Sequence, residues 1–211
     1  MKTWIDIEQW SRKEHFLFFS QFEEPFFGVT VHIDCTLAYQ TAKQNGNSFF
    51  LYYLFRALKT ANEIENFRYR IMDKQVYLFD CIHASPTINR ANGTFGFAYI
   101  DYCQMETDFY AQALREIDRV QQVNDLLPAV SGENVIHFSA IPWIDFTALS
   151  HARSFSYPDS APKISFGKVN EHQGRKTMPI SIHVHHGLMD GYHVGLFIDK
   201  FQKSMNGDYQ E

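Results

Sequence analysis

The sequence predicts an α/β protein, and three observations support this class. The chain of 211 residues is 45% hydrophobic and 20% charged, a balance that allows one sizeable core and disfavours disorder. Some segments carry apolar residues at every second position, as strands do, and others carry them three or four residues apart, as helices do. No repeat, low-complexity segment or linker divides the chain, so we expect one domain over residues 1–211.

The first half of the chain is expected to contain both kinds of element. In order, we expect a helix over 6–16, a strand over 26–33, a helix over 48–62, and strands over 75–78 and 93–100. The first helix has acidic residues near its start, which suits the positive end of the helix dipole. The second has no Gly or Pro and places Leu51, Leu54 and Leu58 on one face.

The second half continues the alternation. We expect a helix over 101–123, strands over 134–139, 141–146 and 163–169, a turn over 171–175, a strand over 178–185 and a helix over 191–205. The first of these helices is amphipathic, with Phe109, Ala113 and Ile117 on one face.

Charge and cysteine content exclude several classes of function. The net charge is −5 and no run of Lys or Arg is present, which disfavours nucleic-acid binding. Cys35, Cys81 and Cys103 are far apart and odd in number, so they indicate neither a disulfide framework nor a metal cluster. Residues 1–6 lack the apolar core of a signal peptide, and no segment approaches the ~18 apolar residues of a membrane span. We expect a cytoplasmic protein.

The residues from 180 to 195 are the ones that suggest chemistry. A strand-like segment delivers His185 and His186 to its end, and Asp190 and Gly191 open the following helix. Imidazole is the natural proton acceptor near neutral pH. A histidine in a turn is also commonly a plain surface residue, so the residue types permit a general base here without requiring one.

The histidines of this segment also raise the question of a metal site. His183 and His185, with His186 and Asp190, offer metal-ligating atoms. Alternation along a strand, however, places His183 and His185 on one side and His186 on the other. We therefore expect no metal, and we expect His185 to be buried or to lie at an interface.

Residues 185–191, His-His-Gly-Leu-Met-Asp-Gly, resemble the His-His-x-x-x-Asp-Gly motif of chloramphenicol acetyltransferases and related acyltransferases. Condensation domains share the motif but need roughly twice this length, and lipoyl-linked acyltransferases normally carry an added lipoyl module. Further blocks resemble the chloramphenicol acetyltransferase family in the same order, at residues 10–16, 138–147 and 190–195. The resemblance spans nearly the whole chain.

This resemblance implies a fold, a reaction and an assembly. The fold would be a two-layer sandwich, a mixed β-sheet with helices packed on one face. The protein would transfer acetyl from acetyl-CoA directly to a hydroxyl of chloramphenicol, in a homotrimer whose active sites lie between subunits. His186 would be the general base, and Ser139 would donate a hydrogen bond to the tetrahedral intermediate. Asp190 would pair with Arg12 and hold the turn that carries His186.

The same resemblance assigns the binding residues. The acceptor would contact Phe18, Phe19, Phe95, Phe97, Leu149 and Ser165, and the coenzyme would contact Phe50 and Val169. Several of these positions depart from the family's pattern. Phe19 stands where Tyr is usual, Phe97 stands where a small residue is usual, and His151 replaces a Leu. The altered pocket keeps two alternatives open: a same-fold enzyme with another hydroxyl acceptor, and a catalytically silent ligand-binding trimer.

Overall fold

The computed structural model describes residues 1–127, 132–154 and 159–208, and its main feature is a seven-stranded mixed sheet. The strands are β2 (Phe26–Asp34), β5 (His83–Asn89), β6 (Phe95–Phe97), β7 (Val135–Ala140), β8 (Lys163–Phe166), β9 (Asn170–His172) and β10 (Arg175–His185). Their order is β2-β10-β8-β7-β5-β6, and β9 pairs with β10. β5, β7 and β8 run parallel to one another, whereas the other pairs are antiparallel.

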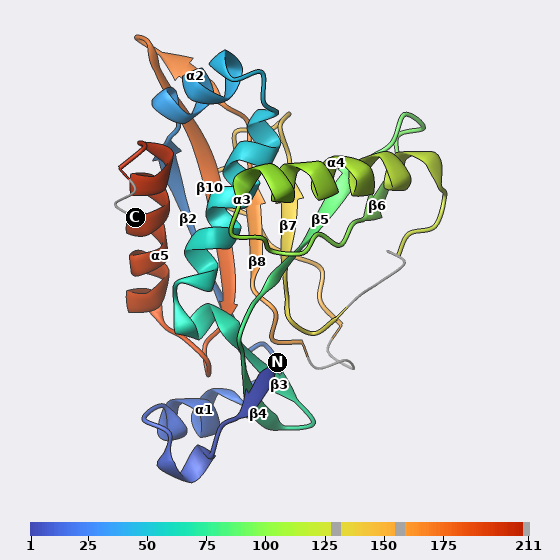
Figure 1. Ribbon diagram of the computed structural model, residues 1–211. Coiled ribbons are helices and arrows are strands. Elements are labelled where there is room, and N and C mark those ends of the chain that lie inside the picture. The colour runs from blue at the N-terminus through green and yellow to red at the C-terminus, as the bar shows by residue number, and fades with distance from the viewer. Residues whose placement is uncertain (128–131, 155–158, 209–211) are drawn as a thin grey trace.

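Helices pack on one face of this sheet (Figure 1). They are α2 (Thr36–Gln44), α3 (Phe49–Asn62), α4 (Glu106–Gln122) and α5 (Gly191–Met205). Leu58 of α3 and Phe197 of α5 are completely buried, as are Ile164 and Ile180 of the sheet. Burying each such side chain contributes about 1.5–3 kcal/mol. The expected two-layer arrangement, with helices on one face of a mixed sheet, is thus confirmed.

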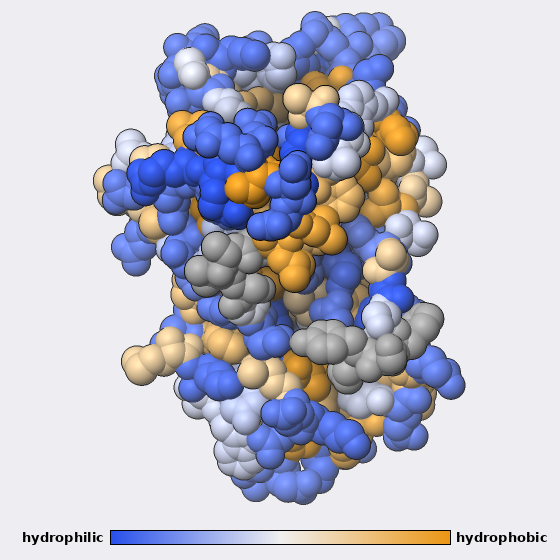
Figure 2. Space-filling model, turned by 90° about the vertical axis from the view of Figure 1, so that its right-hand side faces the viewer, coloured by the Kyte–Doolittle hydropathy of each residue, from blue (hydrophilic) through white to orange (hydrophobic). Residues whose placement is uncertain are grey.

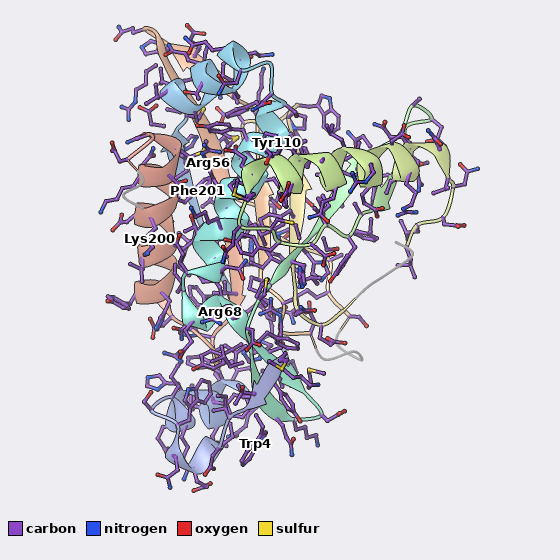
Figure 3. All side chains as sticks on the ribbon, viewed as in Figure 1. Trp4, Arg56, Arg68, Tyr110, Lys200 and Phe201 are labelled. Carbon is purple, nitrogen blue, oxygen red and sulfur yellow. The ribbon has the colours of Figure 1, made fainter. Side chains whose placement is uncertain are left out.

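A partly buried polar cluster connects α3 to α4. Arg56 of α3 donates from Nη1 to the Glu106 carboxylate at 2.9 Å, and the Tyr110 hydroxyl donates to the same carboxylate at 2.5 Å. The Arg56 guanidinium also lies over the Tyr52 ring, 3.3 Å from its centroid. Figure 3 shows Arg56 and Tyr110 between the two helices. Because Arg56 and Tyr110 both donate to the Glu106 carboxylate, the cluster fixes how α4 lies on α3.

A small three-stranded sheet with its own core lies below the main sheet in Figure 1. Its strands are β1 (Lys2–Trp4), β3 (Tyr69–Met72) and β4 (Gln75–Phe79), accompanied by η1 (Ile7–Gln9), α1 (Lys13–Phe19) and η2 (Glu65–Arg68). Phe16, Tyr69, Val76 and Leu188 form this core. Leu188 belongs to the turn after β10, so the small core anchors that turn.

Several expected elements differ from the structure: the helix expected over 101–123 is α4 (Glu106–Gln122), the strand expected over 163–169 ends at Phe166, and three others differ more strongly. The helix expected over 6–16 is divided into η1 and α1, because Trp10 between them is extended and its ring packs on Phe16 and Tyr69. The strand expected over 93–100 is limited to Phe95–Phe97. The strand expected over 141–146 is wrong: Pro142 has no N–H to donate, and the Ile144 N–H donates to the Ile141 carbonyl at 3.2 Å within a turn.

The surface combines hydrophilic side chains with apolar ones. Figure 2 shows apolar side chains gathered near the centre of the face that carries β6 and the end of α4. Phe95 of β6 and Leu114 of α4 are among the large apolar residues exposed in the chain. Among the described residues, no helix has the length and apolar content needed to cross a membrane.

Candidate active site

An ion pair that bridges the two ends of the chain holds the turn between β10 and α5. Arg12 donates from Nη1 to Oδ2 of Asp190 at 2.9 Å, and its side chain is only 11% exposed. The same guanidinium lies 3.4 Å, Nη2 to O, from the carbonyl of His186. The expected pairing of Arg12 with Asp190 is therefore present, and it reaches the backbone of His186.

Asp190 also caps helix α5. Its Oδ1 accepts from the N–H of Tyr192 at 3.0 Å, while its own N–H donates to Nδ1 of His193 at 3.2 Å, which completes a capping box. Burial opposes ionisation of the carboxyl, but the hydrogen bond from Arg12 and the nearby His193 outweigh it and lower the pKa of Asp190. One carboxylate thus fixes both the turn and the first residues of α5.

Two aromatic rings hold the imidazole of His186. The ring of Phe19 stacks on it at a centroid distance of 3.8 Å and an angle of 7°, and Phe27 of β2 lies at 4.5 Å. The backbone N–H of His186 donates to the Pro25 carbonyl at 2.8 Å. Its Nδ1 is buried and has no partner among the residues that the structure describes. Ring and backbone are therefore both fixed.

His185 supports the turn from the other side of the strand. Its side chain is buried, as expected, and its Nδ1 accepts from the N–H of Gly187 at 3.1 Å. Burial lowers the pKa of His185 to about 4, so the ring is neutral near pH 7. A neutral ring with Nδ1 free to accept is what this contact requires.

Ser139 lies on the sheet face that the helices do not cover. Ser139 of β7 pairs with Ser165 of β8, which pairs in turn with Ser181 of β10. Their neighbours Phe138 and Ile164 point into the core under the helices, so the serines point the other way. The Ser165 hydroxyl is buried without a partner among the described residues.

Within one chain, Ser139 and His186 lie far apart. Ser181, in register with Ser139, precedes His186 by five residues, about 17 Å of strand, and Ser139 is two strands away, about 10 Å. The His186 ring also lies against Phe27, which packs on the helix side of the sheet. A separation of about 20 Å, on opposite faces, prevents the two side chains from acting on the same atom.

The predicted acceptor residues form two groups, one near His186 and one on the side of Ser139. Phe19 stacks on His186, and Phe18, which is 58% exposed, lies against Phe19 with the ring centroids 5.1 Å apart. Phe95 and Phe97 of β6, Leu149 and Ser165 lie toward the Ser139 side. Phe97 pairs with Thr87 of β5. The residue before Thr87, Pro86, is in register with Phe138, so Thr87 and Phe97 lie on the same face as Ser139. The backbone of Leu149 lies close to His183, on the same face.

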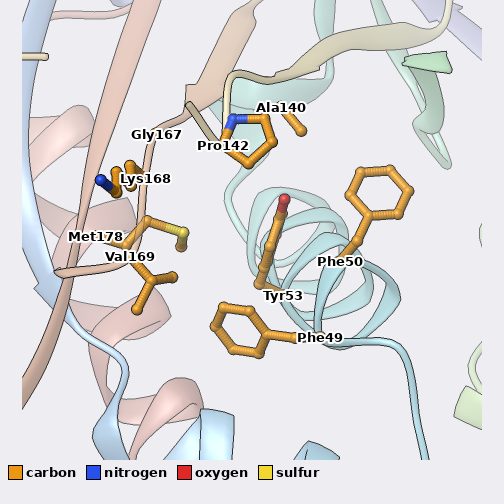
Figure 4. Close-up of a pocket in the computed structure, with 9 residues that line it drawn as sticks. All are labelled: Phe49, Phe50, Tyr53, Ala140, Pro142, Gly167, Lys168, Val169 and Met178. Atoms are coloured by element: carbon orange, nitrogen blue, oxygen red, sulfur yellow. The ribbon is translucent and has the colours of Figure 1, made fainter. Parts of the chain in front are cut away.

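A pocket of about 420 Å³ lies beside the end of β7 (Figure 4). It is lined by Phe49, Phe50, Tyr53, Ala140, Pro142, Gly167, Lys168, Val169 and Met178. Phe50 and Val169 are the two predicted coenzyme residues, and the structure brings them together here. Ala140 follows Ser139 directly, but alternation turns its side chain to the helix side, so the pocket and the Ser139 hydroxyl lie on opposite faces of the sheet.

Some residues around His186 and in the pocket were not expected there. Phe27 and Pro25 hold His186, and Tyr53 and Lys168 line the pocket, yet none was predicted to lie there. Alternation in residues 26–33 does place Phe27 on the buried side of its strand. No sequence pattern indicates which side chain it meets.

We expect Arg12→Met to destabilise the fold by about 2 kcal/mol, because the variant leaves the partly buried Asp190 carboxylate without its partner. Urea unfolding at pH 7.5 measures this change. Lys13→Met is the matched control: Lys13 pairs with Glu8 at the surface, and its loss should leave the unfolding midpoint unchanged. Equal midpoints for the two variants would contradict a structural role of the Arg12 pair.

We expect acid to destabilise the protein below about pH 6.5 because buried histidines must charge. Burial, the first cause for each, lowers the pKa of His137, His151 and His185 to about 4. Their stabilising contribution is present above the unfolded pKa of about 6.5 and is lost as the pH falls toward 4. The free energy of unfolding should fall by about 2 kcal/mol or more from pH 7 to 4.5. A His151→Leu variant should show a shallower fall, and an identical slope would contradict this origin.

Comparison with known proteins shows the family to which the chain belongs. The family model described as chloramphenicol acetyltransferase matches residues 1–202. A chloramphenicol acetyltransferase of Proteus mirabilis is 30% identical over 202 residues, covering 94% of this chain and 92% of that protein. Chloramphenicol acetyltransferase 3 of Escherichia coli is 27% identical over 208 residues, covering 97% of each.

Solved structures agree as well. A chloramphenicol acetyltransferase structure matches with a TM-score of 0.90 and 36% identity, covering 97% of this chain and 100% of that chain. A probable dihydrolipoamide acetyltransferase from Listeria monocytogenes has a TM-score of 0.68 at 12% identity, covers 98% of this chain and 94% of that chain, and shares the fold. With a family model that matches residues 1–202 and relatives named as acyltransferases, the chain belongs to the chloramphenicol acetyltransferase family.

Proposed function

We propose that this protein is an acetyl-CoA-dependent O-acetyltransferase in which His186 is the general base. The observation that carries the proposal is the fixed imidazole: Phe19 and Phe27 hold the ring, and the Arg12–Asp190 pair holds its turn. A base held in one orientation is what proton transfer to or from a bound hydroxyl needs.

The reaction we propose is a direct transfer. Nε2 of His186 takes the proton of the acceptor hydroxyl while that oxygen attacks the thioester carbon of acetyl-CoA. The hydroxyl of Ser139 donates to the oxyanion of the tetrahedral intermediate, and one such donor contributes about 3 kcal/mol in other acyl-transfer sites. The intermediate expels the CoA thiolate, which takes the proton from His186. The products are the acetyl ester and free CoA, and no step uses a metal ion.

The pocket at the end of β7, on the helix side of the sheet, suits part of the arm of the coenzyme. Most of its lining is apolar, including Phe50 and Val169, and the exposed Lys168 adds a cation at its edge. An apolar channel with a terminal cation fits an extended arm that ends in phosphates.

We further propose that residues 1–211 act as one domain in a cytoplasmic homotrimer, with each active site between two subunits. The separation of Ser139 from His186 in one chain supports a site that takes each from a different subunit. Trp143 and Ile144, which follow Ser139 by a few residues, are large apolar side chains exposed in the isolated chain. Exposed apolar residues of this size often lie at interfaces.

The acceptor named by the relatives, chloramphenicol, is the first one to test. Purified protein with acetyl-CoA and chloramphenicol should release free CoA thiol, which a thiol-reactive dye records. Release only with other hydroxyl compounds would move the function to a different metabolite. No release with any acceptor, from intact trimers, would sink the catalytic proposal and leave a ligand-binding protein.

A further inference from the structure

The sheet face that carries Ser139 is polar beyond the row of serines. A second row lies two residues along the strands from the serines: His137 of β7 pairs with Lys163 of β8, and Lys163 pairs with His183 of β10. Residues two apart on a strand share a face, so this second row lies directly beside Ser139. A molecule placed against the Ser139 hydroxyl therefore meets imidazoles and an ammonium group.

His151, from the loop after β7, lies over the second row. Its ring meets that of His183 edge-on, with centroids 4.8 Å apart and an angle of 88°. Burial, together with the charges of His183, Lys163 and His137, lowers its pKa to about 4. Its Nε2 is buried and lacks a partner among the described residues. A buried ring nitrogen without a partner is costly, and a bound polar group would satisfy it.

The charges around these histidines are already compensated. Lys163 is paired with Asp159. Arg153 donates to Glu24 at 2.8 Å, and its guanidinium lies 3.5 Å from the centroid of the Phe26 ring. The face thus presents no surplus positive charge to an anion. Near pH 7 it presents neutral imidazoles, each with one donor and one acceptor nitrogen.

We infer that the acceptor of this enzyme is a neutral, hydroxyl-rich molecule, held by hydrogen bonds to His151 and His137. This inference rests on the proposed acetyl transfer and names its substrate class. A hydroxyl is also one donor and one acceptor, so it matches a neutral imidazole, whereas an apolar surface would leave the ring nitrogens desolvated without partners. Sites built to hydrogen bond a hydroxyl reject ligands that lack it.

The test compares three acceptors in the full-length protein: methyl glucoside, the corresponding glucuronate and chloramphenicol. His151→Leu should lower kcat/KM for methyl glucoside by about tenfold or more and raise it for chloramphenicol, because the pocket loses a hydrogen bond and gains apolar surface. His151→Gln keeps an amide donor and should retain most of the wild-type preference. His172→Leu, at an exposed residue of β9, is the matched control. It should leave unchanged the ratio of kcat/KM for methyl glucoside to kcat/KM for chloramphenicol.

Calorimetric binding of methyl glucoside without acetyl-CoA provides a readout that does not depend on turnover. Weaker binding by His151→Leu but not by His172→Leu supports the inference. An unchanged acceptor ratio and unchanged binding in His151→Leu, or tighter binding of glucuronate by the wild type, overturns it while acetyl transfer stands. Binding that depends on His151 without transfer to any acceptor overturns the proposed reaction and keeps the binding site.

Discussion

His186→Ala is expected to lower kcat for acetyl transfer by about 10²- to 10⁴-fold, the usual contribution of a positioned general base. No other described imidazole is stacked between Phe19 and Phe27, so the variant has no substitute at that place. Release of CoA thiol under saturating substrates measures the effect.

The fold should survive the change at His186. The ring contacts Phe19 and Phe27, but the turn is held by its backbone and by the Arg12–Asp190 pair. Circular dichroism and light scattering should therefore match the wild type. His172→Ala, at an exposed histidine of β9, should keep full activity. A His186→Ala variant with near-normal kcat would remove His186 as the base.

Co-assembly of two inactive variants should restore activity. His186→Ala and Ser139→Ala chains each lack one half of every site. Because Ser139 and His186 lie about 20 Å apart in one chain, we expect an intact site to take them from different subunits. Random trimers from an equal mixture would hold both intact residues at about a quarter of their interfaces, since each chain contributes to two of them. Activity should rise to about that fraction of the wild type.

The two variants must be unfolded and refolded together, or expressed together, for this exchange to occur. Folded homotrimers mixed without unfolding serve as the control and should stay inactive. If refolded mixtures also stay inactive while trimers form, each site belongs to a single chain, and the shared-site proposal fails.

Elements with strong periodicity were predicted well from the sequence. The helices expected over 48–62 and 191–205 correspond to α3 and α5 almost to the residue, and the strand over 178–185 lies within β10. These segments each have one wide apolar face or a continuous buried run, so burial and local propensity favour the same conformation.

Other elements lacked such a signal. β5 was not expected, because Ala84, Ser85 and Pro86 are all buried and a proline argues against a central strand. α2 was also missed, because its buried residues are only Ala38 and Ala42. β1 and β3 are too short for their periodicity to stand out.

The candidate active site was predictable only in part, because several of its contacts join residues far apart in the sequence. The pattern around His186 indicated a base on a strand-to-helix turn. The partner of Asp190 is 178 positions away at Arg12, and no local pattern specifies such a contact; the family resemblance supplied it. The positions of Phe27 and His151 depend on the register of β2 and on a loop path. Both are set by tertiary packing rather than by nearby residues.

The pairing of β2 with β10 has a consequence for how the chain is made. Asp34 to Phe26 pair with Thr177 to His185, about 150 residues later. At a synthesis rate of about 5–20 residues per second, the first strand of the main sheet emerges roughly 7–30 s before its neighbour β10 exists. During that interval the aromatic residues of β2 must be kept from other nascent chains, so we expect the yield of native protein to depend on translation speed and on chaperones.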